Sequence, residues 1–155
     1  MLSLFFRNLF FTLLQPGMVA GVIPYWIAGC NDCFKFPWRF GRYAGVLVWL
    51  TGLVIMLWCI TGFALRGRGT LSPVDPTRKL VIHGLYRFSR NPMYVGVMLI
   101  LIGEALFSQS MNLWVYLIVI FVAFNAFVIW REEPRLTRDF GNEYVEYRKQ
   151  VRRWL

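Results

Sequence analysis

The stretch that decides the fold runs from Tyr43 to Leu65 and reads YAGVLVWLTGLVIMLWCITGFAL, without a charged residue or a proline. A helix that crosses a lipid bilayer needs about 20 consecutive apolar residues, so this stretch predicts a membrane-spanning helix. Over the whole chain of 155 residues, 57% are hydrophobic and 16% are charged, whereas soluble domains average about 25% charged residues. The sequence therefore predicts an integral membrane protein.

A first apolar segment, residues 9–29, precedes this stretch and carries no charge. It contains Pro16 and Pro24, and proline removes a backbone donor and bends a helix. Within a membrane bundle, neighbouring helices can satisfy the backbone groups that a proline leaves free. We therefore expect residues 9–29 to span the bilayer as a kinked helix, followed by a straight span over residues 43–65.

Two further apolar segments, residues 92–107 and 113–131, are separated by the polar run SQSMN. This pattern predicts a helical hairpin of two short spans. Asn91 suits the N-cap of the first helix of this hairpin, and Pro92 suits its first turn. At the far end, Pro134 predicts that the last span stops at the residue before it.

The segment from Thr137 to Trp154 is too polar to span a bilayer. Its aromatic and apolar residues recur at three- and four-residue steps, which predicts an amphipathic helix on the membrane surface or against the long polar loop. The predicted fold class is therefore all-α: a polytopic membrane protein with about four transmembrane helices and a C-terminal amphipathic helix. We expect a single domain over residues 1–155.

The basic residues are distributed unevenly between the two sides of this predicted topology. One Lys or Arg precedes the first span, residues 66–90 contain six and residues 131–155 contain seven, whereas the loop between the first two spans contains three. Because cytoplasmic loops are enriched in Lys and Arg, both termini and the long loop are predicted to be cytoplasmic. Contact with anionic lipids explains the net charge of +9, so no nucleic-acid binding is expected.

The sequence offers no pattern for a metal site. Cys30 and Cys33 form a CxxC pair, but a zinc site needs a second pair or suitably spaced histidines. The single histidine, His83, lies fifty residues further along the chain. We therefore expect no metal. His83 is a weaker candidate for a general base, since a lone histidine in a loop is more often solvated.

Two polar segments, residues 67–96 and 131–147, flank the predicted hairpin and must meet at its cytoplasmic end. The first ends in GLYRFSRNPMYVG, residues 84–96. The second contains REEPRL, residues 131–136, and FGNEYVEY, residues 140–147. These runs resemble the isoprenylcysteine carboxyl methyltransferase and phospholipid N-methyltransferase superfamily of membrane enzymes, over about the second half of the chain.

The resemblance implies a membrane methyltransferase that uses S-adenosylmethionine and acts on a lipid-like or hydrophobic acceptor at the cytoplasmic face. It also implies that an acid of the REEP motif contacts the cofactor, a role that falls to Glu132 first and to Glu133 second. By the same alignment, the segment from Arg78 to Val81 lies along the cofactor. The lipid bilayer is the expected partner, and the resemblance identifies no protein partner.

The chemistry of several residues fits such a cofactor independently. Arg87 and Arg90 offer forked donors for its carboxylate, and a helix that starts at Pro92 adds backbone N–H groups and a positive dipole end. Tyr86 and Tyr94 can face the sulfonium or stack on the adenine, because cations are attracted to aromatic faces. The polar segment that enters the third span is therefore predicted to hold the cofactor.

The acid pair and two glycines complete the predicted site. If the last span ends at them, Glu132 and Glu133 lie at the negative end of a helix dipole, where a ligand cation stabilises them. Gly84 and Gly96 permit close approach of the backbone to adenosine. The predicted catalytic residues are Arg90, Tyr94 and Glu132. The predicted cofactor-binding residues are Arg78, Lys79, Leu80, Val81, Gly84, Tyr86, Arg87, Arg90, Asn91, Pro92, Tyr94, Gly96, Glu132 and Glu133.

Each of these residues also has a simpler explanation. The arginines satisfy the positive-inside rule, the tyrosines suit an interfacial belt, and Glu132 can pair with Arg135 three residues on. Glu104 lies within a predicted span, which favours a function, yet helix pairing explains it equally well. Only the joint spacing, Y-x3-R-N-P-x-Y-x-G before one span and R-E-E-P after the next, favours a shared site.

The sequence leaves the acceptor open. Family members that act on prenylated cysteine carry an arginine about four residues before the acid pair. At that position this chain has the stretch from Phe127 to Trp130, which contains no arginine. The methyl acceptor could therefore be a carboxylate, a phospholipid amine, a small hydrophobic thiol or an unusual acceptor. Two functions of other classes are weighed against methyl transfer: an NAD(P)H-dependent membrane reductase of sterol-reductase-like architecture, and a non-catalytic membrane subunit.

Overall fold

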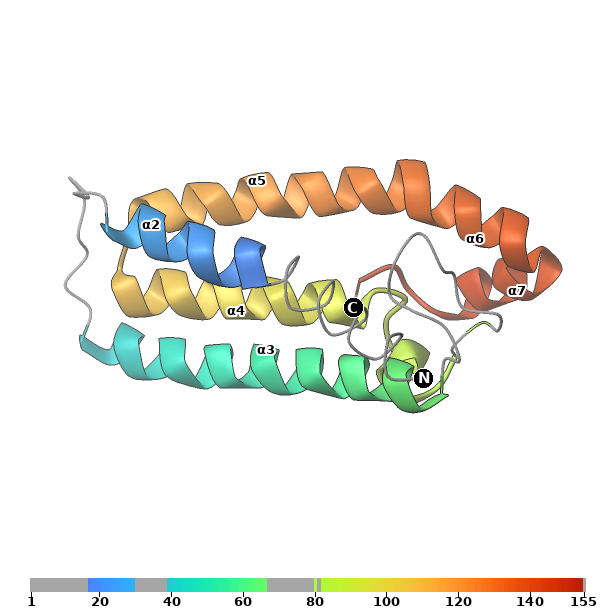
Figure 1. The fold of residues 1–155 in the computed structure, drawn as a ribbon, viewed down its shortest axis with the longest axis horizontal. Coiled ribbons are helices and arrows are strands. Elements are labelled where there is room, and N and C mark those ends of the chain that lie inside the picture. The colour runs from blue at the N-terminus through green and yellow to red at the C-terminus, as the bar shows by residue number, and fades with distance from the viewer. Residues whose placement is uncertain (1–16, 30–38, 67–79, 81, 155) are drawn as a thin grey trace, which may run out of the picture.

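The long helices lie side by side in a bundle, and a short helical hairpin projects from one end of it (Figure 1). This computed structural model describes residues 17–29, 39–66, 80 and 82–154. Among the described residues every regular element is a helix, which confirms the predicted all-α fold class. The elements are η1 (Met18–Val22), α2 (Ile23–Gly29), α3 (Arg39–Arg66), η2 (Gly84–Arg87), α4 (Pro92–Ser108), α5 (Met111–Phe127), η3 (Val128–Glu132), α6 (Glu133–Phe140) and α7 (Asn142–Gln150).

Within the described ranges, two helices are long and apolar enough to cross a membrane. They are Phe40–Gly62 within α3, and the continuous helix Met111–Phe140 that α5, η3 and α6 form together. The other two apolar helices, Met18–Gly29 and Pro92–Ser108, are shorter. Residues 9–16 of the first predicted span lie outside the described part of the chain.

The outward surface of the bundle is apolar over much of its length. Leu47, Val54 and Trp58 are exposed on α3, and Ile118 and Val122 are exposed on α5. Soluble monomers rarely expose contiguous apolar surface on this scale, because it is costly in water. Lipid tails solvate such side chains, so the surface agrees with the composition of the chain.

Helices α3 and α4 pack through pairs of glycines. A Cβ atom added to Gly52 would lie 2.6 Å from the carbonyl oxygen of Gly96, and one added to Gly103 would lie 2.7 Å from that of Gly45. In each helix the two glycines are seven residues apart, about two turns, so they share one face. Small residues at such positions allow helix backbones in membranes to touch.

The predicted hairpin between the last two apolar helices is confirmed. Gln109 adopts a left-handed conformation with φ of 55°, and Ser110 caps the next helix by accepting a hydrogen bond from the backbone N–H of Leu113 at 3.4 Å. Asn91 and Pro92 occupy the expected N-cap and first helical positions, but the Asn91 side chain makes no capping bond. The amide of Asn91 is used at the candidate site instead.

The predicted end of the last span at Pro134 is wrong. The helix continues through this proline to Phe140, because the turn before it widens into the π-helix η3. Within this turn, the backbone N–H of Glu133 donates to the carbonyl of Val128, five residues back instead of four. The wider turn accommodates the ring and the missing N–H group of proline, which an ordinary α-helical turn does not.

The same arrangement occurs near Pro24, where we expected a kink. The π-helix η1 precedes this proline, and the backbone N–H of Ile23 donates to the carbonyl of Met18. Each π-helix ends two residues before its proline. In both helices, therefore, a local change of hydrogen-bond register absorbs the proline without ending the helix.

The prediction of one continuous amphipathic helix from Thr137 to Trp154 is wrong, because this segment is divided into two helices. Gly141, with φ of 54° and ψ of −128°, separates α6 from α7, and the chain after Gln150 is no longer helical. The apolar face itself was correctly identified, and it faces the protein interior. Tyr144, Tyr147 and Val151 form a buried cluster, against which Leu80, Ile82, Leu136 and Phe140 pack.

Candidate active site

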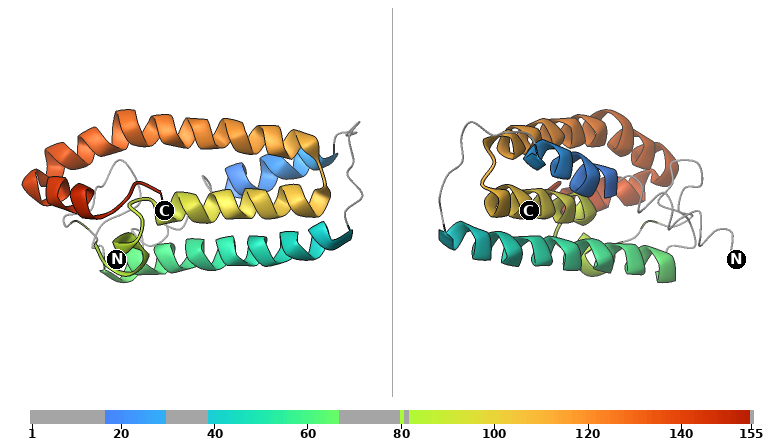
Figure 2. Two further views of the ribbon diagram at one scale, coloured as in Figure 1. Left: turned by 180° about the vertical axis from the view of Figure 1, so that it is seen from behind. Right: turned by 60° about the vertical axis from the view of Figure 1, so that its left-hand side comes forward.

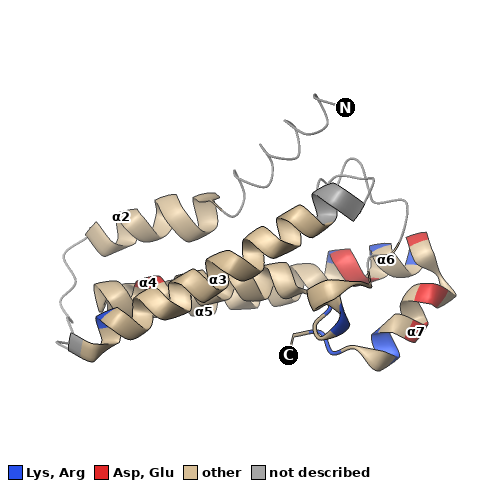
Figure 3. Cartoon of the chain, turned by 90° about the horizontal axis from the view of Figure 1, so that it is seen from below, with Lys and Arg blue, Asp and Glu red and all other residues tan. Residues whose placement is uncertain are grey.

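The α6–α7 hairpin folds back beside the start of α4 and the loop before it (Figure 2). Charged residues gather at this end of the described chain, whereas the helices of the bundle contain few of them (Figure 3). The two segments that the sequence places together do meet here. One of the direct contacts between them is a hydrogen bond in which the Tyr94 hydroxyl donates to Oε2 of Glu132 at 3.2 Å.

Aromatic rings surround the Tyr94 side of this contact. The ring of Tyr94 lies 4.7 Å from that of Phe124 and 6.5 Å from that of Trp154, between centroids. Trp154 is held by its indole N–H, which donates to Oδ1 of Asn125 at 3.3 Å. A carboxylate at the edge of an aromatic cluster attracts organic cations through its charge and through the ring faces.

Glu133 has a different role from Glu132. Its Oε1 lies 3.1 Å from Nη1 of Arg90, and Arg153 donates to it twice, at 2.8 Å and 3.2 Å. The side chains of Glu133 and Arg90 are only 10% and 9% exposed. A buried charge is tolerated when it is paired and hydrogen-bonded, so Glu133 and its two arginines form a structural ion cluster.

The predicted role of Arg90 as a binder of the cofactor's carboxylate competes with its contacts in the fold. Besides Glu133, its guanidinium donates to the hydroxyl of Tyr144 at 3.3 Å, and its backbone N–H donates to the carbonyl of Arg152 at 2.9 Å. Nε of Arg90 is buried without a hydrogen-bond partner in the described residues. Arg90 thus joins the start of α4 to the segment that follows α7.

Residues 151–154 belong to the site, although they were not predicted. The carbonyl of Arg153 accepts hydrogen bonds from Asn91 Nδ2 at 3.0 Å and from Ser89 Oγ at 3.4 Å. Together with the Arg90 bond and the Trp154 indole, these contacts attach the segment to α4 and α5. The aromatic periodicity of the tail included Trp154. The prediction of one continuous helix placed this residue wrongly, because the chain is no longer helical after Gln150.

Tyr86 lies beneath the hairpin and meets α3. The Tyr147 hydroxyl donates to the backbone carbonyl of Tyr86 at 2.6 Å, and the Tyr86 side chain hydrogen-bonds the thiol of Cys59. Burial raises the pKa of the Tyr86 phenol well above its ordinary value, so this hydroxyl stays protonated at neutral pH. A small cavity of about 30 Å³ adjoins it, lined by Trp58, Cys59, Gly62, His83, Gly84, Leu85 and Tyr86.

The remaining predicted residues have varied surroundings. Arg78, Lys79 and Val81 lie outside the described part of the chain, and Leu80 packs against the buried tyrosines of α7. The side chain of Arg87 is exposed. Gly84 has a positive φ of 66° and is exposed, as a residue that offers its backbone to a ligand must be.

Gly96 is used differently from what we expected. A Cβ atom at this position would lie 3.1 Å from the carbonyl oxygen of Gly52 and from the backbone nitrogen of Met56. The close approach that the missing side chain permits is therefore to helix α3. Gly96 contributes to the packing of the bundle next to the site.

The predicted helix-dipole argument for the acid pair is also wrong. It required the last span to end at Glu132 and Glu133, whereas the helix runs on to Phe140. The acids therefore lie inside a helix, at the π-turn η3, where the dipole has no free end. Arg135 forms its ion pair with Asp139, at 3.9 Å, so the simpler pairing of Glu132 with Arg135 is not what the structure shows.

Two residues left open by the sequence lie away from this contact. His83 is exposed beside the small cavity. Glu104 lies far along α4, towards the opposite end, and its Oε2 is buried without a hydrogen-bond partner in the described residues. No group of three potential metal ligands occurs in the part of the chain that the structure describes.

Comparisons with known proteins identify a family for this chain. Residues 40–143 match the phospholipid methyltransferase family. An uncharacterized protein of Haemophilus influenzae is 40% identical over 63 residues, which cover 41% of this chain and 100% of the relative. Two proteins of Oryza sativa, from subspecies indica and japonica, are each named a probable protein-S-isoprenylcysteine O-methyltransferase.

The rice proteins are 26% identical to this chain over 130 residues, which are 78% of the chain and 66% of each relative. No solved structure matches the chain. The family match covers well over half of the sequence and includes both polar segments of the site, as far as residue 143. The chain therefore belongs to the phospholipid methyltransferase family, within the superfamily that also contains the isoprenylcysteine carboxyl methyltransferases.

Proposed function

We propose that this protein transfers a methyl group from S-adenosylmethionine to a lipid-like or hydrophobic acceptor at the cytoplasmic face of a membrane, which the chain crosses about four times as one domain. The observation that carries the proposal is the contact between Tyr94 and Glu132, 3.2 Å apart. It joins the two polar motifs of the chain, which are separated by the α4–α5 hairpin. Family membership supports methyl transfer over a reductase or a non-catalytic subunit.

The residues at this contact suit the charges of S-adenosylmethionine. That molecule supplies a methyl group on a positively charged sulfonium, and it also carries an ammonium group. Glu132 offers a carboxylate to either cation, and the rings of Tyr94 and Trp154 offer aromatic faces beside it. Glu133, neutralised by Arg90 and Arg153, holds the surrounding elements in place instead.

The tasks of the protein in this reaction are alignment and exclusion of water. Displacement at a methyl group requires the acceptor and the leaving sulfur to lie in line, which rigid positioning favours. The segment after α7 packs Trp154 against Phe121 and Tyr94, so the apolar cluster covers the Tyr94 side of the contact. In this proposal Glu132 orients the methyl donor. Tyr94 fixes the carboxylate of Glu132, and Arg90 fixes the start of α4.

The acceptor is proposed by its chemical class only. The stretch Phe127 to Trp130 has no side chain that binds an anion, and Trp130 is 76% exposed on the outside of the helix. An acceptor carboxylate would have to be held by other residues. A carboxylate needs no base, whereas an amine or a thiol must first lose a proton.

The test uses the full chain, purified and returned to lipid bilayers. We expect it to bind S-adenosylmethionine in calorimetry and to transfer an isotopically labelled methyl group to a component of a membrane lipid extract. Glu132→Gln should lower the transfer rate by roughly a hundredfold, because the charge facing the donor is lost. The matched control is Glu143→Gln, which neutralises an exposed acid on α7 and should leave the rate unchanged.

Two outcomes would contradict the proposal. One is that the unaltered protein binds no S-adenosylmethionine. The other is that Glu132→Gln transfers methyl groups as fast as the control.

A further inference from the structure

A second concave feature lies on the α6–α7 hairpin, apart from the contact between Tyr94 and Glu132. It is an open groove of about 440 Å³ between the end of the long helix and α7. Polar and apolar residues line it together. The lining residues are Ile129, Glu133, Pro134, Thr137, Arg138 and Arg148.

The groove carries a net positive charge. Arg138 is 78% exposed, and its ion pair with the adjacent Asp139, at 3.7 Å, is of the weak surface type. Arg148 is exposed on α7. Glu133, the one acid in the lining, is neutralised by Arg90 and Arg153, so it does not cancel the charge of the two groove arginines.

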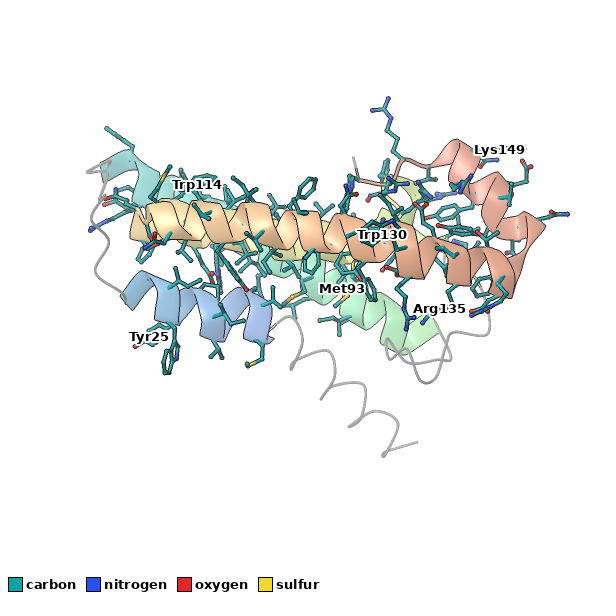
Figure 4. The ribbon with its side chains drawn as sticks, turned by 90° about the horizontal axis from the view of Figure 1, so that it is seen from above. Tyr25, Met93, Trp114, Trp130, Arg135 and Lys149 are labelled. Atoms are coloured by element: carbon teal, nitrogen blue, oxygen red, sulfur yellow. The ribbon has the colours of Figure 1, made fainter. Side chains whose placement is uncertain are left out.

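The position of the groove relates it to the bilayer. The exposed apolar surface of α5 continues through Phe127, Ile129 and Trp130, and the groove begins at Ile129. Figure 4 shows Trp130 near the end of this apolar run and Lys149 on the hairpin beyond it. A phospholipid has the same order of parts, with hydrocarbon tails followed within a few ångströms by a phosphate.

We propose that this groove binds the headgroup of an anionic phospholipid. In this assignment the guanidinium groups of Arg138 and Arg148 hold the phosphate, since planar donors match its oxygens. The acyl chain then lies along Ile129 and the lipid-facing side of α5. The site is independent of the methyl-transfer reaction, so it stands whether or not that proposal holds.

Native mass spectrometry of the full chain in detergent tests the assignment. The protein is incubated with equal amounts of phosphatidylglycerol, which is anionic, and phosphatidylcholine, which has no net charge, and the bound lipids are counted. We expect the unaltered protein to retain mainly phosphatidylglycerol. Arg138→Gln with Arg148→Gln should reduce its retention by roughly thirtyfold, in line with the attraction of two basic residues to an anionic lipid.

The matched control removes the same charge outside the groove, with Lys149→Gln and Arg152→Gln, and should retain the lipid. Thermal unfolding of both double variants, compared with the unaltered protein, shows whether the fold is intact, and each single groove variant should give an intermediate loss. Equal loss in the control would overturn the assignment, as would full retention in the groove variant. Complete displacement of the lipid by millimolar inorganic phosphate would also overturn it, because the groove would then be a site for free phosphate.

Discussion

Two neighbouring carboxylates at the centre of the site serve different purposes. Consecutive residues of a helix point about 100° apart, so Glu132 and Glu133 face different parts of the molecule. Glu132 reaches Tyr94 on α4, whereas Glu133 reaches Arg90 and Arg153. Substitution of the two acids is therefore expected to give two distinct phenotypes.

The first expected effect at this scale is loss of stability in Glu133→Gln. Removal of one member of a buried ion pair leaves the other charge without compensation, which costs about 3–5 kcal/mol. We expect the free energy of unfolding, measured by denaturant titration in detergent, to fall by about 3 kcal/mol. Glu143→Gln on α7 is the control and should unfold like the unaltered protein. A Glu133→Gln variant as stable as this control would show that the ion cluster is not structural.

The second effect concerns pH and Tyr147. Burial raises the pKa of the Tyr147 phenol from its ordinary value near 10 to about 12 in the folded protein. The neutral phenol therefore stabilises the fold fully below pH 10, and this contribution is lost as the pH rises through 12. In Tyr147→Phe, stability at neutral pH should be about 1 kcal/mol lower, because the bond to the Tyr86 carbonyl is gone.

The measurement for Tyr147 is the dependence of thermal unfolding on pH between 8 and 12. The curve of Tyr147→Phe should be flatter above pH 10 than that of the unaltered protein. Parallel curves would mean that this phenol does not titrate with unfolding.

At the scale of the helices, backbone contact between α3 and α4 organises the bundle. Gly45 and Gly52 face Gly103 and Gly96, two turns apart along both helices. The helix pair thus fixes the position of the start of α4, with Tyr94, relative to α3. Packing without side chains depends on the absence of a Cβ atom, so it is sensitive to the smallest substitution.

Gly52→Ala tests this packing. A methyl group there would lie 2.6 Å from the Gly96 carbonyl oxygen, so the helices must separate, at a cost of about 1–3 kcal/mol. The control in the same helix is Gly62→Ala, where nothing lies within 4 Å of the added carbon. We expect Gly52→Ala to unfold at a lower temperature and Gly62→Ala to unfold at the same or a higher one, since alanine favours the helix. Equal effects of the two substitutions would contradict the packing.

At the scale of the whole molecule, the sequence predicted the features that depend on local patterns. The uncharged run from Tyr43 to Leu65 and the polar turn at Ser110 each appear in the structure as helix and turn. The meeting of Tyr94 with Glu132 was predicted because the hairpin between them returns the chain to the same end. These conclusions needed only periodicity, length and two motifs.

Other features depend on contacts between distant parts of the chain, and the sequence did not reveal them. Pro134 ends an α-helix by its chemistry, and only the neighbouring turn decides whether a π-helix absorbs it. Arg153 contacts Asn91, 62 positions away, and no local pattern indicates this. The same holds for Gly96. From the sequence alone, a glycine there could allow close approach either of a ligand or of another helix, and only the structure shows that its neighbour is helix α3.

The proposed topology makes a prediction about sidedness. Fourteen of the seventeen Lys and Arg residues would face the cytoplasm, with the segment that contains Cys30 and Cys33 on the opposite side. In intact cells, a membrane-impermeant maleimide should label these native cysteines. An introduced cysteine, Glu143→Cys in a Cys30→Ser and Cys33→Ser background, should react only after the membrane is opened. Labelling of both positions from the same side would rule out this arrangement.

The glycine contacts between α3 and α4 also restrict how a hydrophobic molecule reaches the site from the surrounding lipid. Where two backbones touch, no hydrocarbon chain fits between them. Sliding one helix along the other would bring the position of a glycine against bulky side chains such as Trp49. This seam of the bundle is therefore closed to lateral entry. In the proposed reaction, the acyl tail of a lipid acceptor would therefore have to reach Glu132 between other helices, where side chains rather than main chains form the barrier.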